Sequence, residues 1–367
     1  MIRISKILLI ATLVFTACTT EDKGDGGEGT NGTDNFDRGA MLANWADNII
    51  IPAYANFYAS TNDLQEATAT FTENPTEEGL IALRAQFENS YIDFQTVSMF
   101  DIGKAEELNY RRFLNTYPLN ADAVESKIES ETYNLELPSS YTEQGFPALD
   151  YLLNGIGETD AEIVAKYNSE NYKNYLLDVA TRINTLTQAV NDSWNGDYRD
   201  NFVSNISSSS TGSVDKFSNK YIMYFETFLR SGKIGYPAGA FTDSPSPINV
   251  ESYYSEDLSK KLYLKAVQSS IDFFNGKYFG SSQTGSSYKL FLESMDRADL
   301  SDDILSQFSA IKSQASTLDA SLKNQVETNN TLMLEAFDEL QKEVVLLKLD
   351  MLQALSISVD YVDSDGD

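Results

Sequence analysis

Apolar residues recur at intervals of three and four along most of the chain after residue 36. This spacing places them on one face of a helix, and a helix buries such a face against a neighbour. Alternation of the kind that strands show is scarce. We therefore predict an all-α protein built from two antiparallel helical bundles, with an internal duplication as a hypothesis. The stripes are Leu42, Trp45, Ile49, Ala53 and Phe57; Leu176, Val179, Ile183, Leu186, Val190 and Trp194; Ile304, Phe308, Ile311, Ala315, Leu318 and Leu322; and Phe337, Leu340, Val344, Leu347, Met351 and Leu355.

Proline residues interrupt or open these helices. Pro52 lies inside the first stripe, so we expect a kink or a break in the helix there. The run Asn74-Pro75-Thr76-Glu77 combines a capping side chain, a first-turn proline and an acidic residue. It predicts a second helix that reaches about Met99.

Runs of small and polar residues divide the chain into parts. Loops are expected at residues 196–197, 207–212, 241–247 and 279–287. A division near residues 195–212 gives two halves of ordinary domain size. We therefore predict a first bundle at residues 37–195 and a second at residues 196–367.

The first seventeen residues have the pattern of an export signal. Arg3 and Lys6 precede a short apolar stretch, and small residues precede Cys18. This resembles a bacterial lipoprotein signal, in which Cys18 is lipidated and becomes the new N-terminus. It implies a lipid anchor in the outer membrane of the cell envelope, with a periplasmic or surface-exposed body. A plain secretory signal with an incidental cysteine is the alternative.

Residues 18–36 follow as a glycine-rich, acidic segment without a hydrophobic pattern. Such a composition is typical of a flexible, solvated tether between a lipid and a folded body. Acidic residues soon after a lipidated cysteine also resemble the surface-export signal of Bacteroidetes lipoproteins.

Composition excludes several classes of function. The 367 residues hold 27 Lys and Arg against 55 Asp and Glu, a net charge of −28, which excludes an electrostatic nucleic-acid binder. The sequence has no histidine, so neither a Ser-His-Asp triad nor an HExxH zinc helix can form. One cysteine leaves no disulfide framework and no CxxC metal motif. These absences remove most familiar enzyme mechanisms and favour a binding protein, although they do not settle whether the chain is an enzyme.

A short pattern occurs twice in the chain. Gly145-Phe146-Pro147-Ala148 and Gly235-Tyr236-Pro237-Ala238 each precede a further aromatic residue. Glycine permits a tight turn, and proline can open a helix at its first position. Two such turns facing each other would line a cleft between the bundles.

Around the first of these segments the sequence resembles the imelysin family, exported bacterial proteins often called imelysin-like peptidases. The family pattern Gly-x-His-x-x-Glu, followed by an apolar run, corresponds to residues 145–153. Further similarity lies in Trp45 and in residues 51–54, 226–230, 233–239 and 359–367, so that it covers about residues 37–367. The resemblance implies two related helical bundles and, from some relatives, a role in iron or haem uptake.

The chain departs from this family pattern at the two positions that could hold a metal, the histidine and the glutamate. A histidine and a glutamate three residues apart share one helix face and can hold a metal together. Here the histidine position is Pro147, which has no ligand atom, and the glutamate position is Asp150. A zinc-peptidase mechanism, and zinc itself, are therefore not expected.

Several polar residues near the two turns are candidates for a ligand cleft. Glu226 and Arg230 lie one turn apart on a predicted helix, with Lys233 just beyond, and Asp150 is the best candidate to contact a metal. An ordinary helix ion pair, a capping aspartate and a solvated lysine are the alternative. The candidate residues are Gly145, Pro147, Asp150, Tyr151, Glu226, Arg230, Lys233, Gly235 and Pro237.

The resemblance to this family implies iron as the ligand to consider first. Carboxylate and phenolate oxygens suit ferric iron, tyrosine can ligate haem iron, and the chain has 21 tyrosines. The acidic ending at residues 363–367 begins like a calcium loop but lacks the later glutamate, so we expect a solvated tail. We therefore expect a lipid-anchored binding or accessory protein of the envelope, in iron or haem uptake. A divergent metallopeptidase and a surface module for a protein partner are the alternatives.

Overall fold

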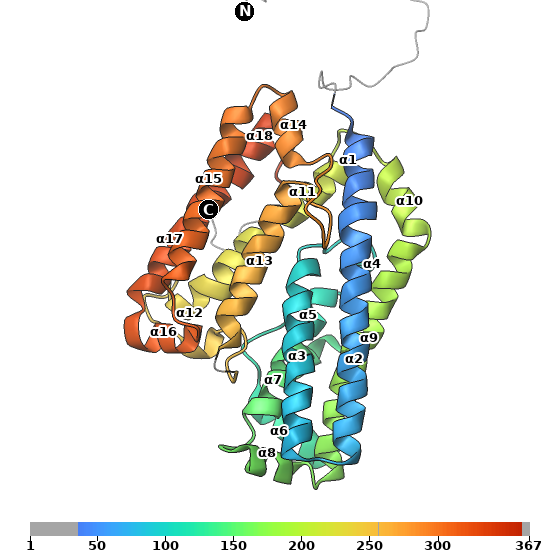
Figure 1. The fold of residues 1–367 in the computed structure, drawn as a ribbon, viewed down its shortest axis with the longest axis vertical. Coiled ribbons are helices and arrows are strands. Elements are labelled where there is room, and N and C mark those ends of the chain that lie inside the picture. Colours follow the sequence, from blue (N-terminus) through green and yellow to red (C-terminus); the bar gives the residue numbers. More distant parts are fainter. Residues whose placement is uncertain (1–35, 256, 362–367) are drawn as a thin grey trace, which may run out of the picture. The chain divides into compact units, whose positions relative to one another are not determined.

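The computed structural model describes residues 36–255 and 257–361 (Figure 1). The predicted signal peptide, Cys18, the tether up to residue 35 and the acidic ending lie outside these residues. Within them the chain forms helices and no strand, apart from one isolated bridge between Lys277 and Thr284. The all-α prediction is confirmed. None of the described helices is long and apolar enough to cross a membrane.

The first helix is the longest continuous element of the N-terminal half. It joins α1 (Arg38–Asn44), the π-helical segment η1 (Trp45–Ile50) and α2 (Ile51–Glu73). The break considered at Pro52 does not occur. Proline cannot donate to the carbonyl four residues before it, that of Asn48, and this oxygen instead accepts a hydrogen bond from the backbone N–H of Phe279 at 2.8 Å.

Two further long helices pack against α2. The first is α3 (Glu77–Val97), which begins where Thr76 accepts a hydrogen bond from the N–H of Gly79, so the predicted second helix is confirmed. The second is α9 (Glu170–Asn195), which carries the predicted stripe from Leu176 to Trp194 on its buried face. The elements between them are α4 (Lys104–Glu107), α5 (Tyr110–Leu114), α6 (Ala121–Ser130), η2 (Pro138–Glu143), α7 (Gly145–Asn154) and α8 (Asp160–Lys166).

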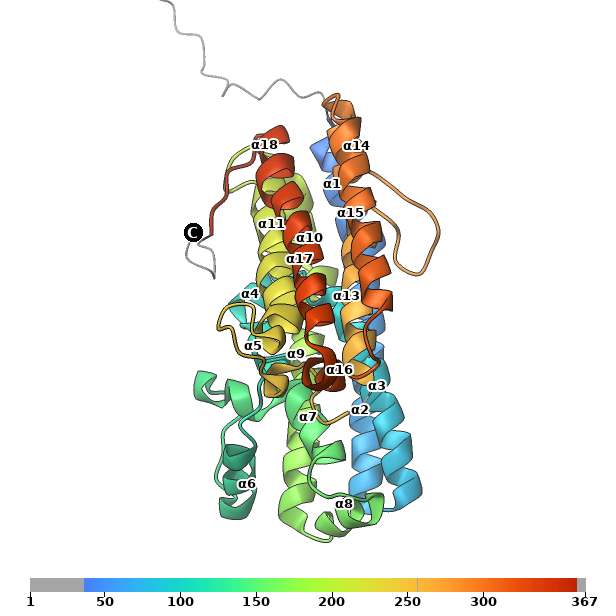
Figure 2. The same ribbon diagram turned by 90° about the vertical axis from the view of Figure 1, so that its left-hand side faces the viewer.

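The C-terminal half is a second bundle, seen most clearly in Figure 2. Its two composite helices are α11 (Ser213–Met223) with η3 (Tyr224–Gly235) and α12 (Tyr236–Ala238), and α17 (Thr331–Val345) with η5 (Leu346–Met351) and α18 (Leu352–Ala354). They pack with α13 (Leu258–Phe274) and α15 (Ala298–Ser316). The shorter elements are α10 (Asp197–Ser204), η4 (Pro247–Asn249), α14 (Tyr288–Ser294) and α16 (Leu322–Asn329).

The two halves share one hydrophobic core. The ring of Trp45, from the first helix, packs against Phe217, Phe273 and Tyr288 of the C-terminal half, with ring centroids 4.9–5.4 Å apart. Helix α13 also packs against α3. The boundary between residues 195 and 196 therefore stays a prediction, although α9 does end at Asn195.

The two glycine-proline segments differ in conformation. Gly145 has φ +75°, and a Cβ there would lie 2.3 Å from the carbonyl oxygen of Leu114, so only glycine fits the turn before α7. Gly235 has φ −65° and lies inside a continuous helix. The expected second turn is therefore wrong at Gly235. The chain turns instead at Gly239, where φ is +73°.

Candidate functional site

Asp150, at the glutamate position of the family pattern, is buried in α7 beneath the segment that precedes α13. Its carboxylate accepts hydrogen bonds from the N–H of Tyr254 at 2.8 Å and from the hydroxyl of Ser255 at 2.5 Å. Asn154 donates a third, longer bond at 3.3 Å. Burial raises the pKa of Asp150 to about 6, against the opposing effect of these hydrogen bonds. The carboxylate thus anchors a loop.

The residues at the motif do not fit a zinc site. Pro147 offers no ligand atom, and the oxygens of Asp150 already accept hydrogen bonds from the loop. Among the described residues, no three Asp, Glu, Cys or His side chains form a group that could hold a metal ion. Tyr151, the next residue, donates to Glu125 of α6 at 2.7 Å, and burial together with Glu125 raises its pKa.

Glu226 and Arg230 face the other composite helix. The carboxylate of Glu226 accepts hydrogen bonds from Lys348 at 3.0 and 3.1 Å and from the hydroxyl of Tyr361 at 2.8 Å. Arg230 lies 3.9 Å from Glu226 and donates to Gln341 of α17. All of these contacts lie within the second bundle, away from Asp150.

Lys233 lies on a different side of η3, toward the first bundle. Its Nζ donates to Oε1 of Gln95 at 2.8 Å and forms a buried ion pair with Glu251. Burial lowers the pKa of Lys233, and Glu251 opposes this effect.

The structure therefore does not bring the predicted cleft residues together, and that prediction is wrong. These residues are Asp150, Glu226, Arg230 and Lys233. In an α-helix, residues seven apart return to the same face. The segment η3 is π-helical, with hydrogen bonds between residues five apart, so Glu226 and Lys233 separate. Gly235 and Pro237 follow in the same continuous helix.

The partners of Lys233 were not predicted from the sequence. Gln95 and Asn115 both donate to Glu251, at 3.3 and 2.7 Å. Tyr91 donates to Asn115 at 2.5 Å, and its ring stacks on that of Phe146, at the start of the motif helix. These residues are far apart along the chain and follow no shared spacing, so no local signal could have indicated them.

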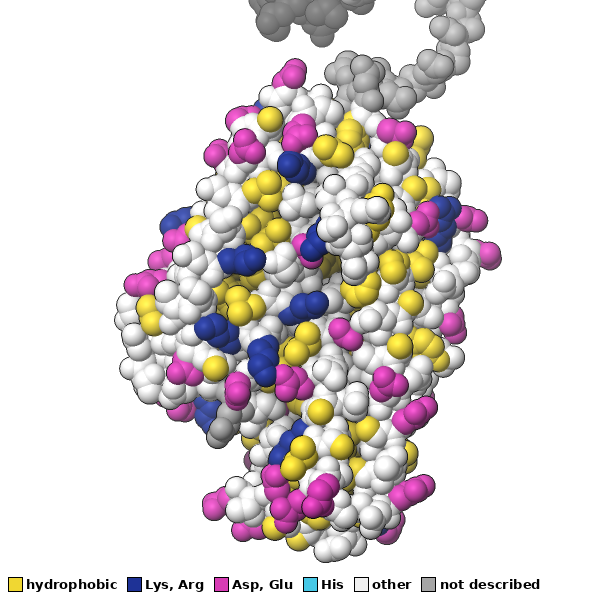
Figure 3. All heavy atoms as spheres, in the orientation of Figure 1, with side chains coloured by type: hydrophobic (Ala, Val, Ile, Leu, Met, Phe, Trp, Pro, Cys, Tyr) yellow, Lys and Arg dark blue, Asp and Glu magenta, His cyan; other side chains and the backbone are white. Residues whose placement is uncertain are grey.

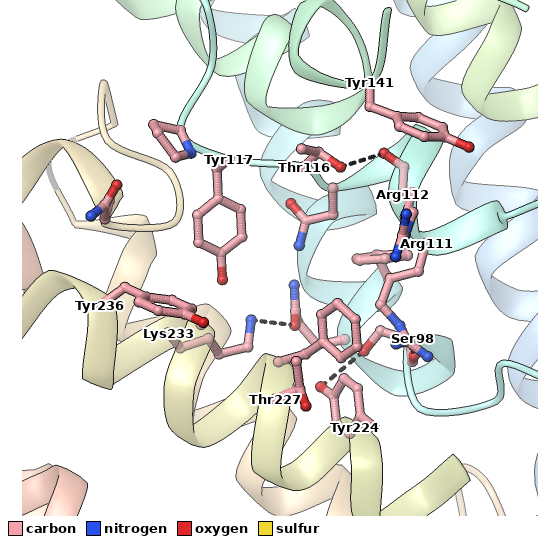
Figure 4. Close-up of a pocket in the computed structure, with 17 residues that line it drawn as sticks. Ser98, Arg111, Arg112, Thr116, Tyr117, Tyr141, Tyr224, Thr227, Lys233 and Tyr236 are labelled. Atoms are coloured by element: carbon pink, nitrogen blue, oxygen red, sulfur yellow. Dashed lines mark hydrogen bonds between the residues drawn. The ribbon is translucent and has the colours of Figure 1, made fainter. Parts of the chain in front are cut away.

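A cavity of about 550 Å³ lies beside Lys233, between η3 and the segment from the end of α3 to Pro118 (Figure 4). Aromatic rings form much of its wall, and its charged residues are Arg111, Arg112 and Lys233, with no aspartate or glutamate. The lining residues are Phe94, Gln95, Ser98, Arg111, Arg112, Asn115, Thr116, Tyr117, Pro118, Tyr141, Tyr224, Thr227, Phe228, Gly232, Lys233, Tyr236 and Asn249.

The two arginines differ in how firmly they are held. Arg111 is buried, donates through Nε to the carbonyl of Ser98 at 2.8 Å, and lies with its guanidinium 4.0 Å from the centroid of the Phe228 ring. Asp101 lies 3.4 Å from its Nη2. Arg112 is exposed and forms no ion pair within the described part of the chain.

Two tyrosines of the cavity direct their hydroxyl groups into it. Figure 4 shows Tyr117 and Tyr236 directed toward the ammonium group of Lys233. Neither hydroxyl forms a hydrogen bond with another residue that the structure describes. Cations, phenol donors and ring faces in one cavity suit an anionic ligand that has flat, apolar parts.

Comparison with known proteins agrees with this fold. An iron-regulated protein A precursor from Parabacteroides distasonis has a similar structure, with a TM-score of 0.71 and 18% identity, over 85% of this chain and 94% of that one. An imelysin-like protein from Psychrobacter arcticum has a TM-score of 0.70 and 16% identity, over 90% of this chain and 100% of that one. A search of curated proteins found no match. The sequence profile of imelysin, peptidase family M75, matches residues 50–347, and the chain belongs to the imelysin family.

Proposed function

We propose that this chain is an exported, non-catalytic binding or accessory protein of the cell envelope that serves iron acquisition. Its ligand is an iron compound that carries carboxylates, haem included, and it binds in the cavity beside Lys233. Family membership and the name of the protein from Parabacteroides distasonis support the link to iron. The observation that carries the proposal is a cavity lined by Arg111, Arg112 and Lys233, and by no acid, in a chain of net charge −28.

The charge of the cavity favours a chelate over a bare ion. Ferric iron by itself binds to several anionic oxygens, and the cavity lining offers none. Lys233 and Arg111 already pair with Glu251 and Asp101, and Arg112 adds a positive charge that would repel the bare ion. A chelate brings its own anionic groups, which pair with Arg111 and Arg112, while its flat parts stack on rings such as that of Phe228. The hydroxyls of Tyr117 and Tyr236 are available to ligate iron that such a compound carries.

The lipid anchor belongs to the same proposal. Lipidation at Cys18 would hold the body at the outer membrane, and the tether would let it reach a ligand. Radiolabelled fatty acid should be incorporated into the wild-type chain and not into Cys18→Ser. A matched control, Ser5→Ala, leaves the predicted lipidation site unchanged.

The decisive experiment is a titration of the Cys18→Ser chain without its signal peptide. Haem, iron-free protoporphyrin, ferric citrate, ferric iron and zinc are each added. We expect one equivalent of haem or ferric citrate to bind, with at least tenfold weaker binding in Arg112→Met, because a charge-assisted hydrogen bond is lost. Arg199→Met is the control, since that arginine is also outside the core, pairs with Asp47 and does not line the cavity.

The iron-free ligand separates two ways of binding. If Tyr117 or Tyr236 ligates iron, haem binds more tightly than protoporphyrin, and Tyr117→Phe or Tyr236→Phe shifts the absorption band of bound haem. Failure of every iron compound to bind would contradict the proposal. Cleavage of a peptide library that chelators stop would favour a divergent metallopeptidase, and a single co-purifying protein would favour a surface interaction module.

A further inference from the structure

The outer side of the composite helix of α17 and η5 carries a strip of apolar side chains. Leu334, Phe337, Val345 and Leu349 follow one another at helical spacing and so share one side of the helix. Leu334 is 39% exposed, Val345 40% and Leu349 57%. In Figure 2 the red helix α17 faces the viewer, and no other described helix covers it. This side of the second bundle is therefore open to a partner.

The strip continues onto the chain that follows α12. The ring of Phe241 packs edge-on against that of Phe337, with centroids 5.5 Å apart, and the ring of Tyr236 lies 5.2 Å from that of Phe241. Phe241 and Tyr236 are both more than a third exposed. The guanidinium of the buried Arg230 lies 5.2 Å from the centroid of the Phe337 ring. These contacts hold the exposed rings in place before any partner binds.

A hollow of about 340 Å³ lies at this end of the strip, between Tyr236, Phe241 and the loop at residues 242–246. Aromatic rings, hydroxyl groups and an amide line it, and none of its lining side chains is charged. A large side chain that fills such a hollow often contributes much of the binding free energy of a protein interface. The hollow therefore offers a place for one anchoring side chain of a partner.

Acidic side chains flank the strip. Glu335 and Asp338 are exposed on α17, Asp243 is exposed on the loop, and none of them forms an ion pair with a residue that the structure describes. Lys342, on the same helix, is itself paired with Glu339 at 2.7 Å. Figure 3 shows magenta side chains along the left-hand rim, near the place of α17 in Figure 1, while dark-blue ones gather nearer the middle. The strip is thus apolar along its centre and negative at its edges.

These negative edges determine which occupant fits. A second copy of this face, or an anionic membrane, would bring like charges together, whereas a basic partner gains from the acids. We infer that the strip docks an amphipathic helix of a partner protein, with apolar residues on one side and Lys or Arg beside them. From Leu334 to Leu349 the strip is about 22 Å long at ~1.5 Å per residue, which matches about four turns of such a helix. The inference does not depend on which ligand the cavity beside Lys233 binds.

Fluorescence anisotropy on the Cys18→Ser chain without its signal peptide tests this. The probe is a labelled helical peptide of leucine and lysine, about four turns long, with leucines at positions i, i+3, i+4 and i+7. A second peptide has the same composition in an order that forms no apolar side, and a third has glutamate in place of lysine. We expect one equivalent of the first peptide to bind, and the other two to bind at least tenfold more weakly.

Variants of the chain place the peptide on the strip. Leu349→Ser and Phe241→Ser should each weaken binding at least tenfold, because an apolar contact is lost. Ile81→Ser is the matched control, since Ile81 is 59% exposed on α3 and lies outside the strip, and it should change the affinity less than twofold. Asp338→Asn should weaken binding and make it less sensitive to salt, whereas Asp303→Asn, at an exposed position on α15, should not.

Several results would overturn the inference. Equal binding of the reordered peptide, or an equal loss in Ile81→Ser, would mean that net charge alone attracts the peptide. A dimer in sedimentation that Leu349→Ser separates would place a second copy on the strip. Binding to phosphatidylglycerol vesicles that the same variant abolishes would place a membrane there. The absence of saturable binding by the first peptide would also count against a docked helix.

Discussion

Lys233 of η3 and Glu251 form an ion pair that is almost wholly buried, with side chains 4% and 3% exposed. Glu251 is also held by Asn115 at 2.7 Å, and Lys233 by Gln95 at 2.8 Å, so residues from both halves of the chain surround the pair. A buried charge whose partner is removed cannot be rehydrated without cost. The pair therefore ties the wall of the cavity beside Lys233 to the first bundle.

Removal of one member of this pair should destabilise the protein strongly. We expect Glu251→Ala to lower the free energy of unfolding by about 3–5 kcal/mol, because it leaves the ammonium group of Lys233 buried and unpaired. Urea unfolding of the variant measures this. In the double variant with Lys233→Met, the loss should be smaller than the sum of the two single losses, and strict additivity would contradict the coupling.

Asp150 should make stability depend on pH. Its pKa is raised to about 6 in the folded protein from an ordinary value of 3.8, so the folded state holds more protons between these values. Stability from this group is therefore fully present below about pH 4 and is lost as the pH rises toward 6, by about 3 kcal/mol in all. The measurement is the difference in unfolding free energy between wild type and Asp150→Asn, from pH 4 to pH 7.

The raised pKa of Asp150 predicts the direction in which stability changes with pH. Wild type should lose stability relative to Asp150→Asn as the pH rises through this window. Asp122→Asn, at an exposed position on α6, serves as the control. A difference that stays constant across the window would show that the Asp150 carboxyl does not take up a proton on folding.

Glu343 should be a destabilising residue at neutral pH. It is 0% exposed in α17, neither carboxylate oxygen has a hydrogen-bond partner within the described structure, and burial raises its pKa well above the usual value. The folded state therefore holds this proton at a pH where the unfolded chain has released it, and stability falls as the pH rises.

Glu343→Met should accordingly raise the free energy of unfolding at pH 7, by about 1–3 kcal/mol. The gain should shrink at pH 4.5, where the unfolded chain also binds the proton. Thermal melts at both values measure it. Glu335→Met, at an exposed position of the same helix, is the control and should change little. An equal gain at both pH values would count against the proposed cause.

Gly145 should tolerate no side chain. Its φ is +75°, and an added Cβ would lie 2.3 Å from the backbone oxygen of Leu114. Gly280 offers a matched comparison, because its φ is +67° but nothing lies within 4 Å of an added Cβ. We expect Gly280→Ala to cost about 1–2 kcal/mol through backbone strain alone. Gly145→Ala should cost about 1–3 kcal/mol more through overpacking; equal losses in chemical denaturation would refute the close contact.

Local patterns predicted the helices because they record local interactions. The stripe from Leu176 to Trp194 lies on the buried face of α9, and Thr76 caps α3 within the run where a helix start was predicted. The stripe from Ile304 to Leu322 was less exact. Helix α15 ends at Ser316, so Leu318 lies beyond it and Leu322 opens α16. Apolar spacing continued across a turn because both sides of that turn face the same core.

The candidate site could be predicted only in part. Lys233 lies at the cavity, but Glu226 and Arg230 face η5 and α17, because the π-helical segment changes which residues share a face. Nothing in the local spacing distinguishes this segment from an α-helix. The cavity residues Arg112 and Tyr117 belong to no recognisable sequence motif. They line a cavity only because η3, which is distant in the sequence, lies opposite them.

The sequence by itself determined the helical class, the family and the loss of the motif histidine at Pro147. These follow from residue identity and from hydrogen bonds between residues four apart, both of which are local. Only the tertiary structure decided which charges are buried together. Gln95, Lys233 and Glu251 meet across a separation of up to 156 residues. The cost of burying a charge depends on every group that surrounds it. The buried group of Gln95, Lys233 and Glu251 therefore forms only when the two halves of the chain have packed together.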